Sequence, residues 1–206
     1  MVGQGIHAAR AADGISSSGG QPPDAELLRR VATAPPHSTA SARALEELFE
    51  RHSAALLRFL TRLLRNDHTA EDMLHDVFVR VAEAAATYRG ESSARTWLFT
   101  LALNRVRTLQ RRNALETRVN TAMANAPRQN SDDRADPFEQ AQSRELRERI
   151  DTAIGELGDG ERETFLLYWF GEMSYAEIST ASGISISAAK VRVHRALARL
   201  GKLLGE

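Results

Sequence analysis

The segment SYAEISTASGISISAAKVRVHRALARLGKLL, residues 174–204, carries the most specific local pattern in the chain. Ser174 precedes Glu177 by three positions, which is the spacing of a capping box at the start of a short helix. Gly183 can adopt the left-handed conformation that ends such a helix, and Ser185 can cap the helix that follows. Two helices separated by so short a turn predict a helix-turn-helix.

The last helix of this segment has two different faces. One is apolar and is expected to pack against the preceding helices through Ala189, Val193, Ala196, Leu197 and Leu200. The opposite side, which we call the recognition face, consists of Ser187, Lys190, Val191, His194 and Ala198, with Arg195 alongside. Arg192 and Arg199 flank this face, where DNA phosphates would lie. Residues 186–205 contain five Lys and Arg residues and no acidic residue, which favours DNA binding over an ordinary solvated helix.

Upstream of this segment, apolar residues recur at helical spacing, and no stretch alternates with the period of a strand. The pattern predicts helices near residues 24–31, 45–64, 69–81 and 93–112, followed by helices around 150–157 and 165–170. Asp24 is the predicted cap of the first helix, and Thr69 with Asp72 resembles a capping box at the start of the third. The sequence therefore predicts an all-α fold.

Composition divides the chain into domains. Residues 1–23 are rich in Gly, Ser, Ala and Pro and are expected to be disordered. Residues 113–140 lose the helical periodicity and gain Asn, Gln, Asp and Pro, which is typical of a flexible acidic linker. We therefore expect two small helical domains, residues 24–112 and residues 141–206, joined by that linker.

The balance of charge is neutral overall and uneven along the chain. The 206 residues include 27 Lys and Arg residues and 27 Asp and Glu residues. Residues 43–112 hold 12 basic and 9 acidic side chains, residues 113–170 hold 7 and 12, and residues 171–206 hold 5 and 3. Two mildly basic ends therefore flank an acidic middle, so the net charge alone would conceal a nucleic-acid surface.

Several classes of protein are excluded by composition. The absence of cysteine excludes a disulfide scaffold, a thiolate metal site and a cysteine nucleophile. No apolar run approaches the roughly 20 residues that cross a bilayer, and the first 20 residues lack the apolar stretch of a secretory signal. We expect a cytoplasmic protein without direct membrane insertion.

Five further motifs precede the helix-turn-helix in a fixed order. They are DAELLRRV (24–31), LEELFERH (45–52), AEDMLHDVFVR (70–80), YRGES (88–92) and TWLFTLALN (96–104). Together with the helix-turn-helix they resemble the bacterial extracytoplasmic-function sigma factors, which are small two-domain initiation subunits of RNA polymerase. The resemblance implies a first domain that binds polymerase and melts the −10 element, and a second domain that recognises the −35 element.

The resemblance also implies roles for particular residues. Docking on the clamp helices of the largest polymerase subunit is assigned to Asp72, His75, Asp76 and Phe78, which combine charge with an apolar anchor. The flap of the second-largest subunit, promoter DNA and an anti-sigma factor are the other implied partners. The −35 element would be read by the recognition face, with Arg192 and Arg199 on phosphates.

A flipped base of the −10 element would enter a pocket formed by the Tyr88–Arg95 loop with Leu101 and Asn104. The predicted −10 contacts are Tyr88, Arg89, Leu101, Asn104, Arg105, Arg111 and Arg112, with Arg107 as a further phosphate-binding cation. No ATP-binding motif is present, so strand opening would depend on stacking and edge contacts to the trapped base. Trp97 shares a stripe with Leu98 and is expected in the core.

Two other functions are compatible with parts of the sequence. A free-standing helix-turn-helix regulator would need the second domain and would leave the motifs of the first domain without a purpose. A metal enzyme could use His68, Glu71 and His75, which share one helical face, although a second set of ligands is missing. We therefore expect no catalytic residue, no cofactor, no bound metal and no small-molecule substrate.

Overall fold

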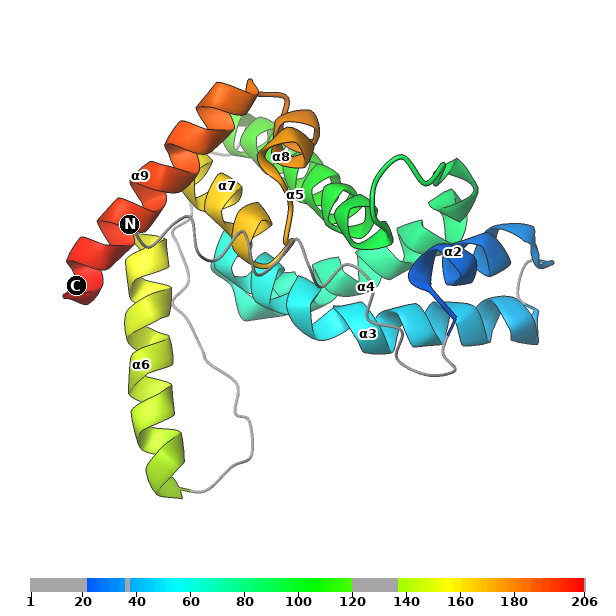
Figure 1. Ribbon diagram of the computed structural model, residues 1–206, viewed down its shortest axis with the longest axis horizontal. Coiled ribbons are helices and arrows are strands. Elements are labelled where there is room, and N and C mark those ends of the chain that lie inside the picture. Colours follow the sequence, from blue (N-terminus) through cyan, green and yellow to red (C-terminus); the bar gives the residue numbers. More distant parts are fainter. Residues whose placement is uncertain (1–21, 36–37, 120–136, 206) are drawn as a thin grey trace.

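The computed structural model describes residues 22–35, 38–119 and 137–205. Within these ranges the chain forms helices joined by turns and loops, and no residue lies in a strand. The predicted all-α fold class is thus confirmed. Figure 1 shows two groups of helices, coloured blue to green and yellow to red, that lie against each other. None of the described helices is long and apolar enough to span a bilayer.

The first group packs around one apolar core. Its elements are α2 (Asp24–Thr33), α3 (Thr39–Leu64), α4 (Asp67–Ala84), the 3-10 helix η1 (Ala85–Thr87) and α5 (Ala94–Val119). Leu27, Leu56, Phe59, Val77 and Leu98 are all almost completely buried in this core. Their helical spacing places one apolar stripe of each helix inward, which is why the periodicity of the sequence predicted these helices.

The second group contains the predicted helix-turn-helix. Its elements are α6 (Pro137–Gly155), α7 (Asp159–Trp169), α8 (Tyr175–Ser182) and α9 (Ile186–Leu204). The side chains and backbone amides of Ser174 and Glu177 form a reciprocal capping box, Gly183 is left-handed with a φ of 68°, and the Ser185 hydroxyl caps α9. Each of these local predictions is confirmed.

Two other predicted caps were wrong. The cap position of α2 is Pro23, while the Asp24 carboxylate accepts hydrogen bonds from Arg51 (2.7 Å) and His52 (2.8 Å) on α3. Helix α4 starts before Thr69, because the side chain of Asn66 accepts the Thr69 amide and caps the helix there. Helix α2 therefore has no side-chain cap, and α4 is capped by a residue three positions before the expected one.

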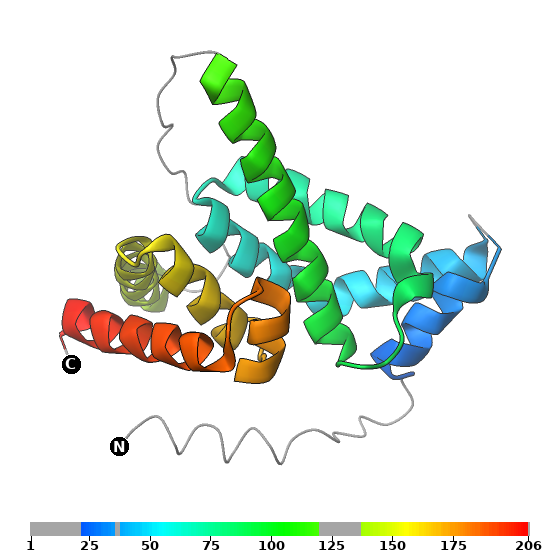
Figure 2. The same cartoon turned by 90° about the horizontal axis from the view of Figure 1, so that it is seen from above.

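The boundaries of the predicted linker also differ from the observed helices. Helix α5 continues past Arg112 to Val119, and α6 begins at Pro137. The segment between Arg112 and Val119 contains no Gly or Pro, so nothing in it stops the helix. The end of α5 projects from the body of the molecule in Figure 2, and the start of α6 projects from it in Figure 1. Residues 120–136 and 1–21, where most of the expected disorder falls, lie outside the described residues.

Candidate nucleic-acid interface

Helix α9 separates its two faces as the sequence predicted. Ala189, Val193 and Ala196 are fully buried and Leu200 is 8% exposed. Every residue of the recognition face is exposed, including Ser187, Lys190, Val191, His194, Arg195 and Ala198. The apolar stripe packs on α7 and α8, so a small and basic surface points outward.

The two flanking arginines differ in their surroundings. Arg199 is exposed. Arg192 is half-buried, and its guanidinium covers Gly160 near the start of α7 so closely that a Cβ there would lie 3.1 Å from Nη1. Arg199 is therefore accessible to DNA, whereas Arg192 also packs within its own domain.

A buried arginine that the sequence pattern did not reveal joins α7 to the end of α6. Arg162 is 7% exposed, and its guanidinium donates to the carbonyls of Ile154 (3.2 Å), Gly155 (3.1 Å) and Leu157 (2.7 Å). These carbonyls lie at the end of α6 and the following turn, where helical partners are missing. Arg162 shares the stripe of Phe165 on α7, and this cation within an apolar stripe was the available signal.

The loop before α5 is closed by short-range hydrogen bonds. The Tyr88 hydroxyl donates to the Ser92 carbonyl at 2.8 Å, and Gly90 between them is left-handed with a φ of 75°. The Ser93 hydroxyl then accepts the Thr96 amide at 3.0 Å and caps α5. Burial and the nearby Asp24 charge raise the pKa of Tyr88, so its phenol stays protonated as a donor. These hydrogen bonds fix the conformation of the loop of residues 88–93, and we call this loop the platform.

Trp97 borders this platform instead of lying within the core. It is half-buried, and its ring meets that of Tyr88 edge-on at a centroid distance of 5.8 Å. Leu101 and Asn104 follow on the same side of α5 as Trp97, Leu101 half-buried and Asn104 exposed. An aromatic pair, an apolar side chain and an amide therefore lie along one surface, and we call Tyr88, Trp97, Leu101 and Asn104 the α5 surface.

The arginines predicted to contact −10 DNA fall into three groups. Arg89, Arg111 and Arg112 are exposed. Arg105 forms an ion pair with Asp76 on α4. Arg107 points to the second domain, where it donates to the Glu163 carboxylate at 2.8 Å. Helical position alone did not distinguish these groups, because the partners of Arg105 and Arg107 come from other helices.

The predicted polymerase-binding residues do not all share one exposed surface. On α4, Asp72 and His75 are exposed, and Asp76 is half-exposed. Phe78 is only 6% exposed and packs edge-on against Phe49 at 4.8 Å. The surface position that the resemblance implied for Phe78 was therefore wrong. The helical periodicity, which instead places Phe78 on the inward stripe with Met73 and Val77, is confirmed.

The metal-site alternative has no support in the geometry. His68 Nδ1 lies 3.1 Å from the Asp72 carboxylate, and both side chains are largely exposed. Across residues 22–35, 38–119 and 137–205, no three His, Asp or Glu side chains gather closely enough to hold a metal ion.

Known families match both halves of this architecture. The Sigma-70 region 2 family matches residues 48–116, and the Sigma-70 region 4 family matches residues 147–200. The RNA polymerase sigma factor CarQ of Myxococcus xanthus is 34% identical over 167 residues, which cover 79% of this chain and 90% of that protein. The chain belongs to the extracytoplasmic-function sigma factors of RNA polymerase. We therefore refer to its two domains as region 2 and region 4.

Further similarities agree with this assignment. The ferric citrate uptake sigma factor FecI of Escherichia coli is 32% identical, covering 78% of this sigma factor and 90% of FecI. The structure of CnrH in complex with the cytosolic domain of CnrY superposes with a TM-score of 0.62 at 25% identity, covering 88% of this chain and 97% of that chain. The sigma factor thus directs promoter-specific transcription, and a free-standing regulator is not favoured because region 2 would have no purpose in one.

Proposed function

We propose that this sigma factor recognises the −35 element through the recognition face of α9. The observation that carries this proposal is the exposure of Lys190, His194 and Arg195 above a buried apolar stripe, in a helix without acidic residues. Lys and Arg bind the acceptors of guanine in the major groove, and Val191 offers an apolar contact to a thymine methyl group. Arg199 would neutralise a phosphate at the edge of this contact.

The α5 surface would hold a −10 base that has left the stack. Asn104 supplies both a hydrogen-bond donor and an acceptor for a base edge, and Leu101 and the Tyr88 ring supply apolar contact. The exposed Arg89, Arg111 and Arg112 would bind the phosphates of the displaced strand. Because binding energy alone opens the strands, the sigma factor would act without catalysis of its own, and without a cofactor or metal.

The exposed face of α4 would dock on the clamp helices of the largest polymerase subunit. Asp72, His75 and Asp76 supply the polar contacts, and Val79, which is 54% exposed, supplies the apolar one that Phe78 cannot. Region 4 would contact the flap of the second-largest subunit. Because the sigma factor RpoE of Bartonella quintana is known in complex with the anti-sigma factor NepR, an anti-sigma factor is a further expected partner, in the bacterial cytoplasm.

Run-off transcription with purified core RNA polymerase on genomic fragments tests this function. We expect discrete transcripts that depend on the sigma factor and share two spaced upstream elements. No transcripts, together with binding of duplex DNA in the absence of polymerase, would instead indicate a free-standing regulator.

Asn104→Ala tests the base pocket separately. Because Asn104 is exposed and does not lie on α4, the substitution should reduce promoter opening about tenfold or more while leaving the affinity for core polymerase unchanged. Permanganate footprinting measures opening, and fluorescence anisotropy measures core binding. Glu50→Ala, at an exposed position of α3 outside both proposed surfaces, is the control and should change neither quantity. Equal losses of opening and core affinity in Asn104→Ala would contradict the assignment.

A further inference from the structure

Charged contacts join α5 of region 2 to region 4. The Arg107 guanidinium donates to the Glu163 carboxylate at 2.8 Å and to the carbonyls of Ala181 at 3.1 Å and Ser182 at 3.2 Å. These carbonyls end α8, where helical partners are missing and a positive charge also stabilises the helix dipole. One cation of region 2 thus satisfies a helix end of region 4.

A second contact involves the start of the helix-turn-helix. The Thr96 hydroxyl, on a side chain that is almost fully buried, donates to the Glu177 carboxylate at 2.8 Å. Glu177 is also the acidic member of the capping box of α8. Its burial alone would raise the pKa, but hydrogen bonds from Ser174 and Thr96 lower it overall, so the carboxylate remains charged. The same residue therefore begins α8 and ties it to α5.

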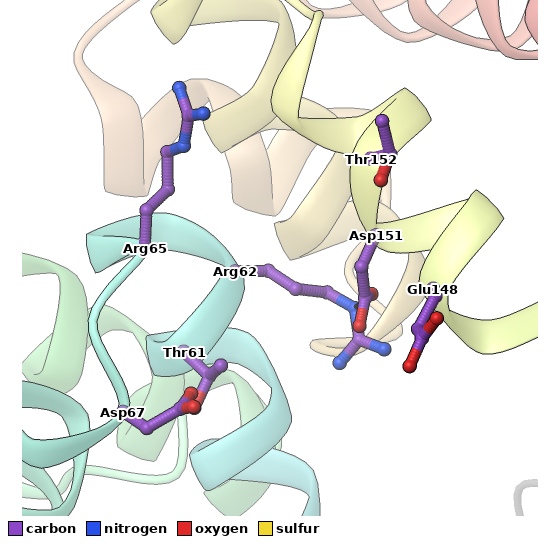
Figure 3. A pocket seen from close by; sticks show the side chains of 7 residues that line it. All are labelled: Thr61, Arg62, Arg65, Asp67, Glu148, Asp151 and Thr152. Atoms are coloured by element: carbon purple, nitrogen blue, oxygen red, sulfur yellow. Dashed lines mark ion pairs between the residues drawn. The ribbon is translucent and has the colours of Figure 1, made fainter. Parts of the chain in front are cut away.

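A third contact lies between α3 and α6. Arg62 reaches from α3 to the Asp151 carboxylate at 2.8 Å, as Figure 3 shows, and its guanidinium also lies 4.9 Å from the centre of the Phe170 ring. A cavity of about 250 Å³ lies beside this pair. Gly171 suits the close approach of the two domains, because a Cβ there would lie 3.3 Å from the Phe99 ring of region 2. It would also lie 2.5 Å from the Leu167 carbonyl of its own domain.

This closed arrangement is too short to span a promoter. Elements centred near −35 and −10 lie about 25 base pairs apart, which is about 85 Å of B-form DNA. Ser182 contacts Arg107 directly, and even a fully extended chain from Ser182 to Ser187 would leave Ser187, at the start of the recognition face, within about 40 Å of Asn104. The helix from Ser187 to Ala198 adds at most about 17 Å, so the whole face lies well short of that span. The recognition face and the α5 surface are both exposed, but one closed molecule can contact only the −35 or the −10 element at a time.

We propose that the contacts of Arg107 with Glu163, Thr96 with Glu177 and Arg62 with Asp151 form an interdomain latch that keeps the free sigma factor closed. The latch also occupies Arg107, a cation that the opened protein would offer to a DNA phosphate. Polymerase favours the open form by holding region 2 and region 4 at separate sites. The assignment of the two DNA surfaces rests on the proposed function, whereas the closure of the free protein does not.

Distance measurement on the free protein tests the latch. The chain lacks cysteine, so Ala54→Cys on α3 and Ala176→Cys on α8, both at exposed positions, can carry spin labels for pulsed electron paramagnetic resonance. The otherwise wild-type chain should give one short distance. Glu163→Ala with Asp151→Ala should raise the ratio of open to closed molecules about tenfold. Glu156→Ala, which removes an exposed carboxylate of region 4, is the control.

The outcomes separate the latch from misfolding and from the promoter assignment. The conservative pair Glu163→Asp with Asp151→Glu, which keeps both carboxylates, should retain the short distance, so opening confined to the alanine variant would support the latch. A broad distribution of long distances in the wild type, or no change in the double variant, would overturn it. The double variant should also bind duplex DNA with both elements about tenfold more tightly. Failure of run-off transcription would contradict only the proposed function.

Discussion

At the scale of single residues, exposure distinguishes the basic side chains that can meet DNA from those that hold the fold. Arg195 is exposed on the recognition face, whereas Arg162 is buried at the base of region 4. Both occupy helices and both carry the same charge, so sequence alone does not rank them. Substitution of Arg195 should therefore lower DNA affinity, whereas substitution of Arg162 should lower the stability of region 4.

Arg195→Ala should weaken the binding of holoenzyme to its −35 element by about 1–3 kcal/mol, because a guanidinium that contacts a base edge contributes in this range. Filter binding on promoter fragments with the native and a scrambled element measures the difference. Arg147→Ala, which removes an exposed arginine of α6, is the matched control. An equal loss of affinity on the scrambled fragment would indicate a phosphate contact instead.

Arg162→Met should destabilise region 4 by about 2–4 kcal/mol, since the carbonyls of Ile154, Gly155 and Leu157 lose their hydrogen bonds to the guanidinium. The chain has two tryptophans, Trp97 in region 2 and Trp169 in region 4. In a Trp97→Phe background, fluorescence during urea unfolding therefore reports on region 4. Arg147→Met is the control, and equal stability of the two variants would contradict the role of Arg162.

At the scale of elements, short-range chemistry fixes where most helices begin, and long-range contacts fix where they dock. The capping box of α8 joins residues three positions apart, so its geometry follows from local sequence. Helix α2 instead docks on α3 through Asp24 with Arg51 and His52, which are nearly 30 positions away. The role of Asp24 was accordingly misread as a cap.

Asp24→Asn should lower the free energy of unfolding of region 2 by about 1.5–3 kcal/mol at pH 5. Hydrogen bonds from His52 and Arg51 outweigh burial and hold the pKa of the Asp24 carboxyl below its ordinary value of 3.8. Because the folded pKa is lowered, this stability is complete above the unfolded pKa and is lost as the pH falls through the folded pKa.

Urea unfolding in a Trp169→Phe background, in which only Trp97 fluoresces, measures this effect from pH 5 downward. The difference between Asp24→Asn and the otherwise unchanged chain should shrink below pH 3.8. Glu46→Gln, at an exposed position of α3, should show no such difference at any pH. A difference that stays constant through this range would show that the Asp24 charge does not contribute.

At the scale of the whole molecule, the arrangement of the two domains decides how much of the promoter one chain can reach. The contacts that close the molecule join residues 56 and 81 positions apart, on either side of the linker. Glu163 and Asp151 belong to the acidic middle of the chain and pair with cations of the basic region 2. The acidic residues in the middle of the sequence thus form ion pairs with the basic residues of region 2, in addition to any role of those basic residues in DNA binding.

The sequence by itself determined the all-α class, most of the helices, the helix-turn-helix and the family, because these depend on periodicity, on caps a few residues apart and on the order of motifs. The tertiary structure alone decided that Arg105 pairs with Asp76, that Arg107 pairs with Glu163 and that region 4 lies against α5. The physical reason is separation along the chain: a side chain's partners and exposure are set by helices that its local sequence does not specify.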